Sequence, residues 1–294
     1  MTTVPRPGTR MTTVPRPGTS GARVPGPRPA QQAGTRRRHA EGTPGKVWFV
    51  GAGPGAADLL TLRGARVIAE ADVVIWAASL VQPEVVAAAT GELLESSNLT
   101  LEEVGAVYDR AAAEGLRVAR VHSGDPSLYG ATGEQIAYCD RVGLAWEIVP
   151  GVSSLAAAAA VAGRELTVPE IAQSVIITRL PTATPMPPGE EVRELARHGT
   201  TMALFLSAKR GRRLQEELLA GGYPPDTPCL VAYRVTWPEE LLAWCRLDEL
   251  ARTLRDARLH KHTLILVGPG LAAEGTRSHL YDPSFAHEFR AART

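Results

Sequence analysis

The residues best suited to chemistry lie in the turn SGDPSLYGA, residues 123–131. An apolar run ends at Val121, and Gly124 and Pro126 prevent the strand from continuing, so the Asp125 carboxylate is left on a loop. Such a carboxylate can accept charge-assisted hydrogen bonds from the hydroxyls or amines of a small ligand. It can equally form an Asx turn that bonds only its own backbone. The turn alone leaves both interpretations open.

A second turn, VGAGPG at residues 50–55, follows the first predicted strand. Gly51, Gly53 and Ala56 satisfy the G-x-G-x-x-G/A spacing of dinucleotide-binding turns. Pro54, however, removes an N–H donor from the middle of the phosphate cradle, and WAAS (76–79) at the end of the second strand has no acid to hold a ribose. The turn therefore favours a cofactor without phosphate. S-adenosyl-L-methionine fits, because its sulfonium suits carbonyl oxygens and carboxylates rather than a row of N–H donors.

The elements that must position these turns alternate between strand and helix patterns from Lys46 onward, which indicates βα units around a mainly parallel sheet. In the first half, strands are predicted at 47–50, 73–76, 92–95, 116–121 and 145–149, and helices at 59–70, 100–115 and 130–143. An alanine-rich helix follows at 155–163. In the second half, strands are predicted at 174–178, 201–207, 228–236 and 262–268, and helices near 209–220 and 247–257.

We therefore expect an α/β protein with two α/β domains, mainly parallel or mixed sheets and an interdomain cofactor cleft. The expected segments are a disordered Pro/Arg-rich tail (1–45), an N-terminal α/β domain (46–153), a C-terminal α/β domain (154–272) and a C-terminal extension (273–294).

Composition narrows the function classes. The chain has no run of 18 apolar residues and no signal-peptide pattern, so we expect a cytoplasmic protein without a membrane partner. Its three cysteines have no metal-binding spacing, and no metal is expected. Residues 1–46 hold nine of the 32 Lys and Arg residues and one of the 31 Asp and Glu residues, which leaves about −7 on the rest. The basic tail is interpreted as solvated, with no nucleic-acid partner.

Four separated motifs occur in the order found in the tetrapyrrole (corrin and porphyrin) methylases, and residues 46 to 270 resemble that family. They are VGAGPG (50–55), SGDPSLYGA (123–131), PGVSS (150–154), and YRVTWPEE (233–240) with KHTLILVG (261–268). Further segments look most like the precorrin-4 C(11)-methyltransferases: ASLVQPEVV (78–86), HSGDPSLYGATGEQ (122–135), GRELTVPE (163–170) and TPMPPGE (184–190). One departure is Ala56-Ala57, where the family often has Asp-Pro.

The resemblance implies a tetrapyrrole methylase fold, a homodimer, S-adenosyl-L-methionine between the domains and a tetrapyrrole substrate in an adjacent trough. It implies transfer of the sulfonium methyl group to C(11) of precorrin-4 or cobalt-precorrin-4, in cobalamin biosynthesis. The alternatives are methylation of another ring carbon, or a nucleotide-dependent oxidoreductase that uses VGAGPG (50–55).

Individual residues are carried over by motif. The cofactor-binding residues that the resemblance implies are Pro54, Ser123, Gly124, Asp125, Leu128, Ser153, Ser154, Leu206, Val235 and Thr263. The substrate carries many carboxylates, for which arginine and lysine are suitable partners. The substrate-binding candidates are Arg63, His122, Tyr129, Arg179, Lys209 and Arg234. His122 and Tyr129 flank Asp125, where each could relay a proton or simply pack, and no general base is identified.

Overall fold

The computed structural model describes residues 10–12, 45–273, 282–286 and 288–291. The chain divides into two compact units: Thr13–Val152 is the first unit, and Met1–Thr12 with Ser153–Thr294 is the second. The expected domain boundary, between residues 153 and 154, lies one residue from this division. Most of the expected tail and part of the C-terminal extension lie outside the described residues. Residues 10–12 form a strand, which the expectation of a wholly disordered tail did not include.

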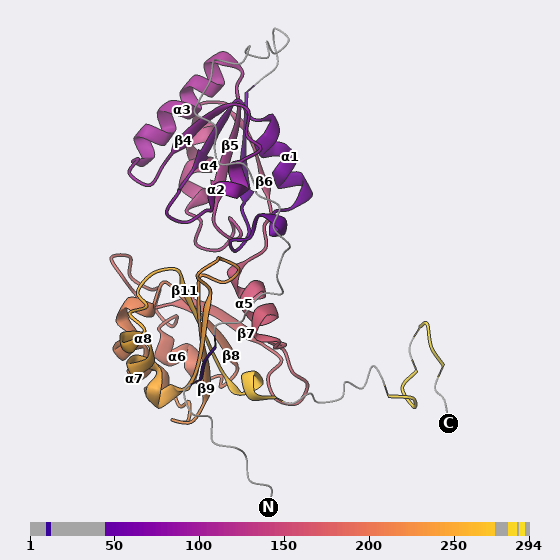
Figure 1. The fold of residues 1–294 in the computed structure, drawn as a ribbon, viewed down its shortest axis with the longest axis vertical. Helices are drawn as coiled ribbons and strands as arrows, with labels where there is room; N and C mark the ends of the chain where they lie inside the picture. Colours follow the sequence, from indigo (N-terminus) through magenta and orange to yellow (C-terminus); the bar gives the residue numbers. More distant parts are fainter. Residues whose placement is uncertain (1–9, 13–44, 274–281, 287, 292–294) are drawn as a thin grey trace, which may run out of the picture. The chain divides into compact units, whose positions relative to one another are not determined.

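The first unit contains a five-stranded sheet in which all neighbouring strands are parallel, in the order β4-β3-β5-β2-β6. Figure 1 shows this sheet in the part of the chain coloured indigo to magenta, with β4, β5 and β6 labelled. Its strands are β2 (Lys46–Gly51), β3 (Val73–Trp76), β4 (Glu92–Glu95), β5 (Arg117–His122) and β6 (Ala145–Val149). Its helices are η1 (Ala57–Leu59), α1 (Leu62–Glu70), α2 (Pro83–Val86), α3 (Leu101–Glu114) and α4 (Thr132–Arg141).

Helices cover both faces of this sheet. Apolar side chains of α1 and α2 pack with one set of strand residues, and those of α3 and α4 pack with the alternate set. Val118 of β5 faces α3 and α4, whereas Ala119 faces α1 and α2. This alternation follows from the two-residue period of a strand. Because parallel strands are buried on both faces, they read as continuous apolar runs in the sequence.

The second unit contains a six-stranded mixed sheet in the order β1-β10-β9-β11-β8-β7, in which only β7 and β8 are parallel. Its strands are β1 (Arg10–Thr12), β7 (Val175–Arg179), β8 (Thr201–Phe205), β9 (Pro228–Tyr233), β10 (Leu241–Arg246) and β11 (Thr263–Val267). Its helices are α5 (Ser154–Ala162), α6 (Val192–Ala196), η2 (Ala208–Arg210), α7 (Gly211–Ala220), η3 (Leu247–Glu249), α8 (Leu250–Asp256) and η4 (Pro269–Ala272).

The faces of this sheet are also covered by different helices. The larger apolar cluster joins the sheet to α6, α7 and α8, and the other joins it to α5 and η4. The small side chains of Ala157 and Ala158 are buried against the sheet, so the alanine-rich helix serves close packing.

Several elements differ from the sequence prediction, and among them the short helices α2 and α6 are absent from the predicted set. The helix predicted from residue 59 begins at Leu62, because the Thr61 hydroxyl caps it by accepting a hydrogen bond from the Gly64 N–H at 3.1 Å. The strand predicted at 228–236 ends at Tyr233, where the backbone turns into the left-handed region. Strand β10, with the sequence LLAWCR, is absent from the predicted set.

No described helix is long and apolar enough to cross a membrane. Within the same part of the chain, no group of three or more His, Cys, Asp or Glu side chains could hold a metal ion. All three cysteines are free and buried.

The loops that follow β2, β5 and β6 meet at the carboxyl edge of the first sheet, where β2 lies between β5 and β6. Gly53 and Gly124 form an antiparallel bridge, in which the Gly53 N–H donates to the Gly124 carbonyl at 3.2 Å and the Gly124 N–H donates to the Gly53 carbonyl at 2.8 Å. A Cβ on Gly51 would stand 2.6 Å from the Gly151 Cα and 2.8 Å from the Gly124 oxygen. Any side chain there would force the loops apart.

The clearest test of this packing is a pair of glycine substitutions. A Cβ on Gly151 would overlap the Gly124 carbonyl oxygen, whereas nothing lies within 4 Å of a Cβ on Gly133 in α4. We expect Gly151→Ala to destabilise the protein by roughly 1–3 kcal/mol, and Gly133→Ala to be neutral or stabilising by up to about 1 kcal/mol. Calorimetric thermal unfolding measures both. Equal effects of the two substitutions would contradict the close crossing.

Candidate functional site

Asp125 joins two of the three loops. One carboxylate oxygen accepts the Ser127 N–H at 2.8 Å and the Ser127 hydroxyl, which makes an Asx turn. The other oxygen accepts the Gly151 N–H at 2.8 Å, from the loop that follows β6. The Asx turn therefore exists, but the side chain also reaches a residue 26 positions away in the sequence. Asp125 holds the shape of the cluster through these bonds.

The same bonds determine the charge of Asp125. Burial raises the pKa of its carboxyl group, but the Ser127 hydroxyl, the Gly151 N–H and the Ser127 N–H outweigh burial and hold the pKa below the ordinary 3.8. The side chain is therefore ionised at neutral pH. It places a negative charge beside the crossing of the glycine loops.

The loop between β5 and α4 is tightly folded. The Leu128 N–H donates to the Asp125 carbonyl at 3.2 Å. Tyr129 and Ala131 have φ values of 57° and 49°, which side chains other than glycine rarely adopt. Such strain persists only where surrounding contacts fix it, and it is common at ligand sites. Ser123 and Tyr129 are exposed, whereas Leu128 is partly buried.

His122, the last residue of β5, is only 8% exposed. The pKa of its imidazole is lowered to about 3, first by burial and then by the nearby positive charge of Arg120. The ring is therefore neutral at physiological pH and cannot offer a cation to a carboxylate. Its Nε2 atom is buried and has no hydrogen-bond partner within the described residues.

In the second unit, the cofactor-binding candidates Leu206, Val235 and Thr263 lie at one edge of the sheet. Strands β8 and β9 end there and β11 begins there, because β11 is antiparallel to both. Val235 and Thr263 are buried, whereas Leu206 is 63% exposed. The exposed apolar Leu206 side chain is available to a ligand.

Backbone strain is concentrated at the same edge. Positive φ angles occur at Leu206 (52°), Arg234 (46°), Thr236 (67°) and His262 (51°). We call these four residues the strained edge. A run of non-glycine residues in this conformation costs free energy that packing elsewhere must offset, and such runs occur mainly at functional sites.

Arg234 is held by its neighbours at the strained edge. Its Nε donates to His262 Nδ1 at 3.3 Å, its Nη1 pairs with Glu239 at 3.2 Å, and its guanidinium lies 5.0 Å from the centre of the Trp237 ring. The Trp237 and His262 rings stack at 5.9 Å. These contacts fix the loop after β9, so the geometry supports a positioning role for Arg234 beside the predicted role in substrate binding.

Ser153 and Ser154 begin α5 in the second unit. The Ser153 hydroxyl accepts the Leu155 N–H at 3.2 Å and so caps the helix, and Ser154 is the first helical residue. The capping bond alone explains why a serine occupies position 153, independently of its predicted role in cofactor binding.

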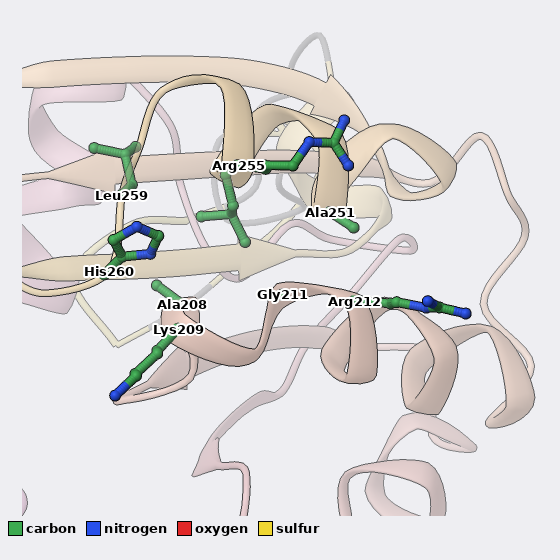
Figure 2. A pocket seen from close by; sticks show the side chains of 9 residues that line it. Ala208, Lys209, Gly211, Arg212, Ala251, Arg255, Leu259 and His260 are labelled. Carbon is green, nitrogen blue, oxygen red and sulfur yellow. The ribbon is translucent and has the colours of Figure 1, made fainter.

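The remaining basic candidates do not form one cluster. Arg63, in the first unit, lies 3.6 Å from Glu147. Arg179 donates to the carbonyls of Leu180 and Thr184, both at 3.2 Å, and so anchors the proline-rich loop after β7. Lys209 lines a pocket of about 340 Å³ in the second unit together with Arg212, Arg255 and His260 (Figure 2).

Two sets of residues in the first unit were not among the predicted site residues. Gly51 and Gly151 form the closest part of the loop crossing, but Gly51 was considered only for its dinucleotide-like spacing and Gly151 only as part of the motif PGVSS (150–154). Arg120 interrupts the apolar run of β5 with a charge. This interruption is visible in the sequence and could have marked Arg120 as a candidate site residue.

The three-loop cluster of the first unit has definite ligand preferences. The glycines at the crossing carry no side chains, so a ligand can approach the backbone closely. Pro54, directly after the Gly53–Gly124 bridge, offers no N–H to a phosphate. Asp125 is ionised nearby. This chemistry fits a cationic cofactor without phosphate, and a sulfonium compound meets both conditions.

The lowered pKa of Asp125 predicts how the stability of the protein depends on pH. A carboxylate with a folded-state pKa below its unfolded value contributes stability that is present above about pH 4 and lost as pH falls through the folded-state pKa. Asp125→Asn cannot accept the Gly151 N–H through its amide nitrogen, so we expect a loss of about 1 kcal/mol at pH 7. Thermal unfolding from pH 7 to 3 should show this difference shrinking. A difference independent of pH would contradict the assignment.

Comparison with known proteins identifies the family. A model of the Tetrapyrrole (Corrin/Porphyrin) Methylases matches residues 46–251. The chain is 42% identical to a cobalt-precorrin-4 C(11)-methyltransferase of Priestia megaterium over 252 residues, which cover 83% of this chain and 97% of the relative. It is 42% identical to a precorrin-4 C(11)-methyltransferase of Pseudomonas aeruginosa over 246 residues, which cover 83% and 98%.

Solved structures agree with the sequence relatives. The X-ray structure of a cobalt precorrin-4 methyltransferase has a TM-score of 0.75 and 40% identity, and covers 78% of this chain and 96% of its own. A uroporphyrin-III C-methyltransferase from Thermus thermophilus, complexed with S-adenosyl homocysteine, has a TM-score of 0.67 and 29% identity, and covers 79% and 96%. The predicted fold class is confirmed, and the chain belongs to the tetrapyrrole (corrin/porphyrin) methylase family.

Proposed function

We propose that this protein transfers a methyl group from S-adenosyl-L-methionine to C(11) of precorrin-4 or cobalt-precorrin-4, in cobalamin biosynthesis. The observation that carries the proposal is the match to proteins named for this activity along 83% of the chain. The uroporphyrin-III enzymes are less similar, at 29–33% identity, so methylation of another ring carbon is the weaker candidate. A homodimer in the cytoplasm is part of the same proposal.

The proposed cofactor residues in the first unit are Pro54, Ser123, Gly124 and Leu128, around the loop crossing. Asp125 acts mainly by holding Gly151, and its negative charge favours the cationic sulfonium. In the second unit, Ser153, Ser154, Leu206, Val235 and Thr263 remain cofactor-binding proposals. The exposed Leu206 is suited to an apolar contact with the cofactor.

When bound, the cofactor supplies an activated methyl group for an in-line displacement by a ring carbon. The protein's contribution is alignment, exclusion of water and accommodation of a positive charge that disappears from the sulfonium. The tight loop from Asp125 to Ala131 suits this task, because internal hydrogen bonds and a strained backbone favour a loop that is ordered before the ligands arrive. None of the residues described at the loop crossing is assigned as a general base.

Two measurements test the proposal. Calorimetric titration should show binding of S-adenosylhomocysteine, and NADH should not bind.

Incubation with S-adenosylmethionine carrying a ¹³C-labelled methyl group should label C(11) of precorrin-4 or cobalt-precorrin-4, as detected by mass and NMR analysis. Testing both forms side by side decides which is the substrate. Labelling of uroporphyrinogen III alone would contradict the C(11) assignment, and absence of S-adenosylhomocysteine binding would contradict the activity as a whole.

A further inference from the structure

Arg120 is a positively charged residue on an interior strand of the first sheet, and its side chain is partly buried. It lies in β5, in register with Ile75 of β3 and Phe49 of β2, so neighbouring strands flank it on both sides. It shares a sheet face with Val118, which packs against α3 and α4. The strands of a parallel sheet are normally apolar on both faces. An arginine at this position therefore needs a physical explanation.

The partners of the Arg120 guanidinium are all neutral. Its Nε donates to the Gln135 side-chain oxygen at 3.2 Å, and its Nη1 donates to the Ser96 hydroxyl at 2.9 Å. The same Gln135 oxygen accepts the Tyr108 hydroxyl at 2.8 Å, and the Gln135 amide donates to the Ala131 carbonyl at 3.1 Å. The Arg120 Nη2 makes no hydrogen bond within the described residues. Among those residues, no carboxylate forms an ion pair with Arg120.

Three other arginines of the first unit, Arg63, Arg110 and Arg117, have a counter-charge. Arg110 pairs with Glu92 at 2.7 Å, and Arg117 pairs with Glu70. Burial lowers the pKa of Arg120, which reflects the cost of keeping its charge in the interior, yet a guanidinium remains protonated in proteins. Arg120 is partly buried, and a charge shielded from water without a counter-charge is unfavourable, because neutral hydrogen bonds offset only part of that cost.

The position of Arg120 points toward a ligand site. It lies two residues before the end of β5, Ser96 directly follows β4, and Gln135 lies in the first turns of α4. All three therefore lie near the carboxyl edge of the parallel sheet, where α/β proteins bind ligands. His122, the next residue on the same face, is 8% exposed, and its Nε2 has no partner within the described residues. A neutral imidazole always carries one N–H.

We propose that Arg120 binds a carboxylate group of the tetrapyrrole substrate through its free Nη2, with the His122 imidazole as a second donor. The carboxylate supplies the counter-charge that the protein itself lacks. The identity of the ligand rests on the proposed function, because a tetrapyrrole with acetate and propionate side chains is the polycarboxylate that such an enzyme meets. The network of Gln135, Tyr108 and Ser96 then serves to hold the guanidinium in position.

The test uses uroporphyrin, a stable fluorescent porphyrin octacarboxylate, as the probe in fluorescence titrations of the full chain. We expect Arg120→Met to bind uroporphyrin about tenfold more weakly, because a charge-assisted hydrogen bond is lost. Its affinity for S-adenosylhomocysteine should stay within about twofold of wild type. Its unfolding temperature should be unchanged or higher, since an apolar replacement of a partly buried charge without a counter-charge is neutral or stabilising.

The matched control is Arg110→Met, in the same unit, where Glu92 already provides the counter-charge. It should leave uroporphyrin affinity unchanged. Arg120→Lys keeps the charge without the planar fork and should recover part of the affinity. If Arg120→Met lowers both affinity and unfolding temperature, recovery by Arg120→Lys supports the site, and lack of recovery contradicts it.

Two results would overturn the inference. One is unchanged uroporphyrin affinity in a folded Arg120→Met protein, and the other is failure of that variant to fold. Either result would mean that Arg120 has a structural role and does not bind the substrate. Failure of the proposed function gives a different pattern. In that case the wild-type protein methylates neither form of precorrin-4, while the dependence of uroporphyrin affinity on Arg120 remains as expected.

Discussion

The structure of the first unit depends on a close approach of three backbone segments that leaves no room for side chains. Gly51 and Gly151 come so close that a Cβ on either would overlap the other loop, and the Gly124 carbonyl lies against both. Asp125 fixes the arrangement by accepting the Gly151 N–H. Hydrogen bonds between neighbouring strands align the sheet, but the close approach of the glycines fixes the direction of the three loops. The cofactor chemistry proposed for the protein follows from a surface made of backbone and one ionised carboxylate.

The two units use different means to shape their loops. In the first unit, the glycines at the crossing leave no side chain between the loops, and a hydrogen bond from the Gly151 N–H to Asp125 fixes the backbone. In the second, four non-glycine residues are held in the left-handed region, and the Arg234, Trp237 and His262 side chains pack together around them. Both arrangements cost free energy locally and are sustained by the apolar clusters on the two faces of each sheet.

Much of this fold could be predicted because buried parallel strands leave a strong apolar signal, as in VWFV (47–50) and VVIW (73–76). Strand β10 was missed, and β9 was extended too far, because the turn between them depends on left-handed backbone at Arg234 and Thr236 rather than on glycine. Sequence spacing could identify the Asx turn of Asp125, but the bond to Gly151 depends on which strands are neighbours in the sheet. Arg120 was overlooked within an apolar run, although a charge in an interior strand is itself informative.

Hydrogen–deuterium exchange with and without saturating S-adenosylhomocysteine tests the central claim most directly, because it reports on the loops themselves. We expect slower exchange on ligand binding in peptides that contain residues 51–55, 123–131 and 149–152. Binding that leaves exchange in all three of these loops unchanged, with protection only elsewhere in the chain, would contradict it.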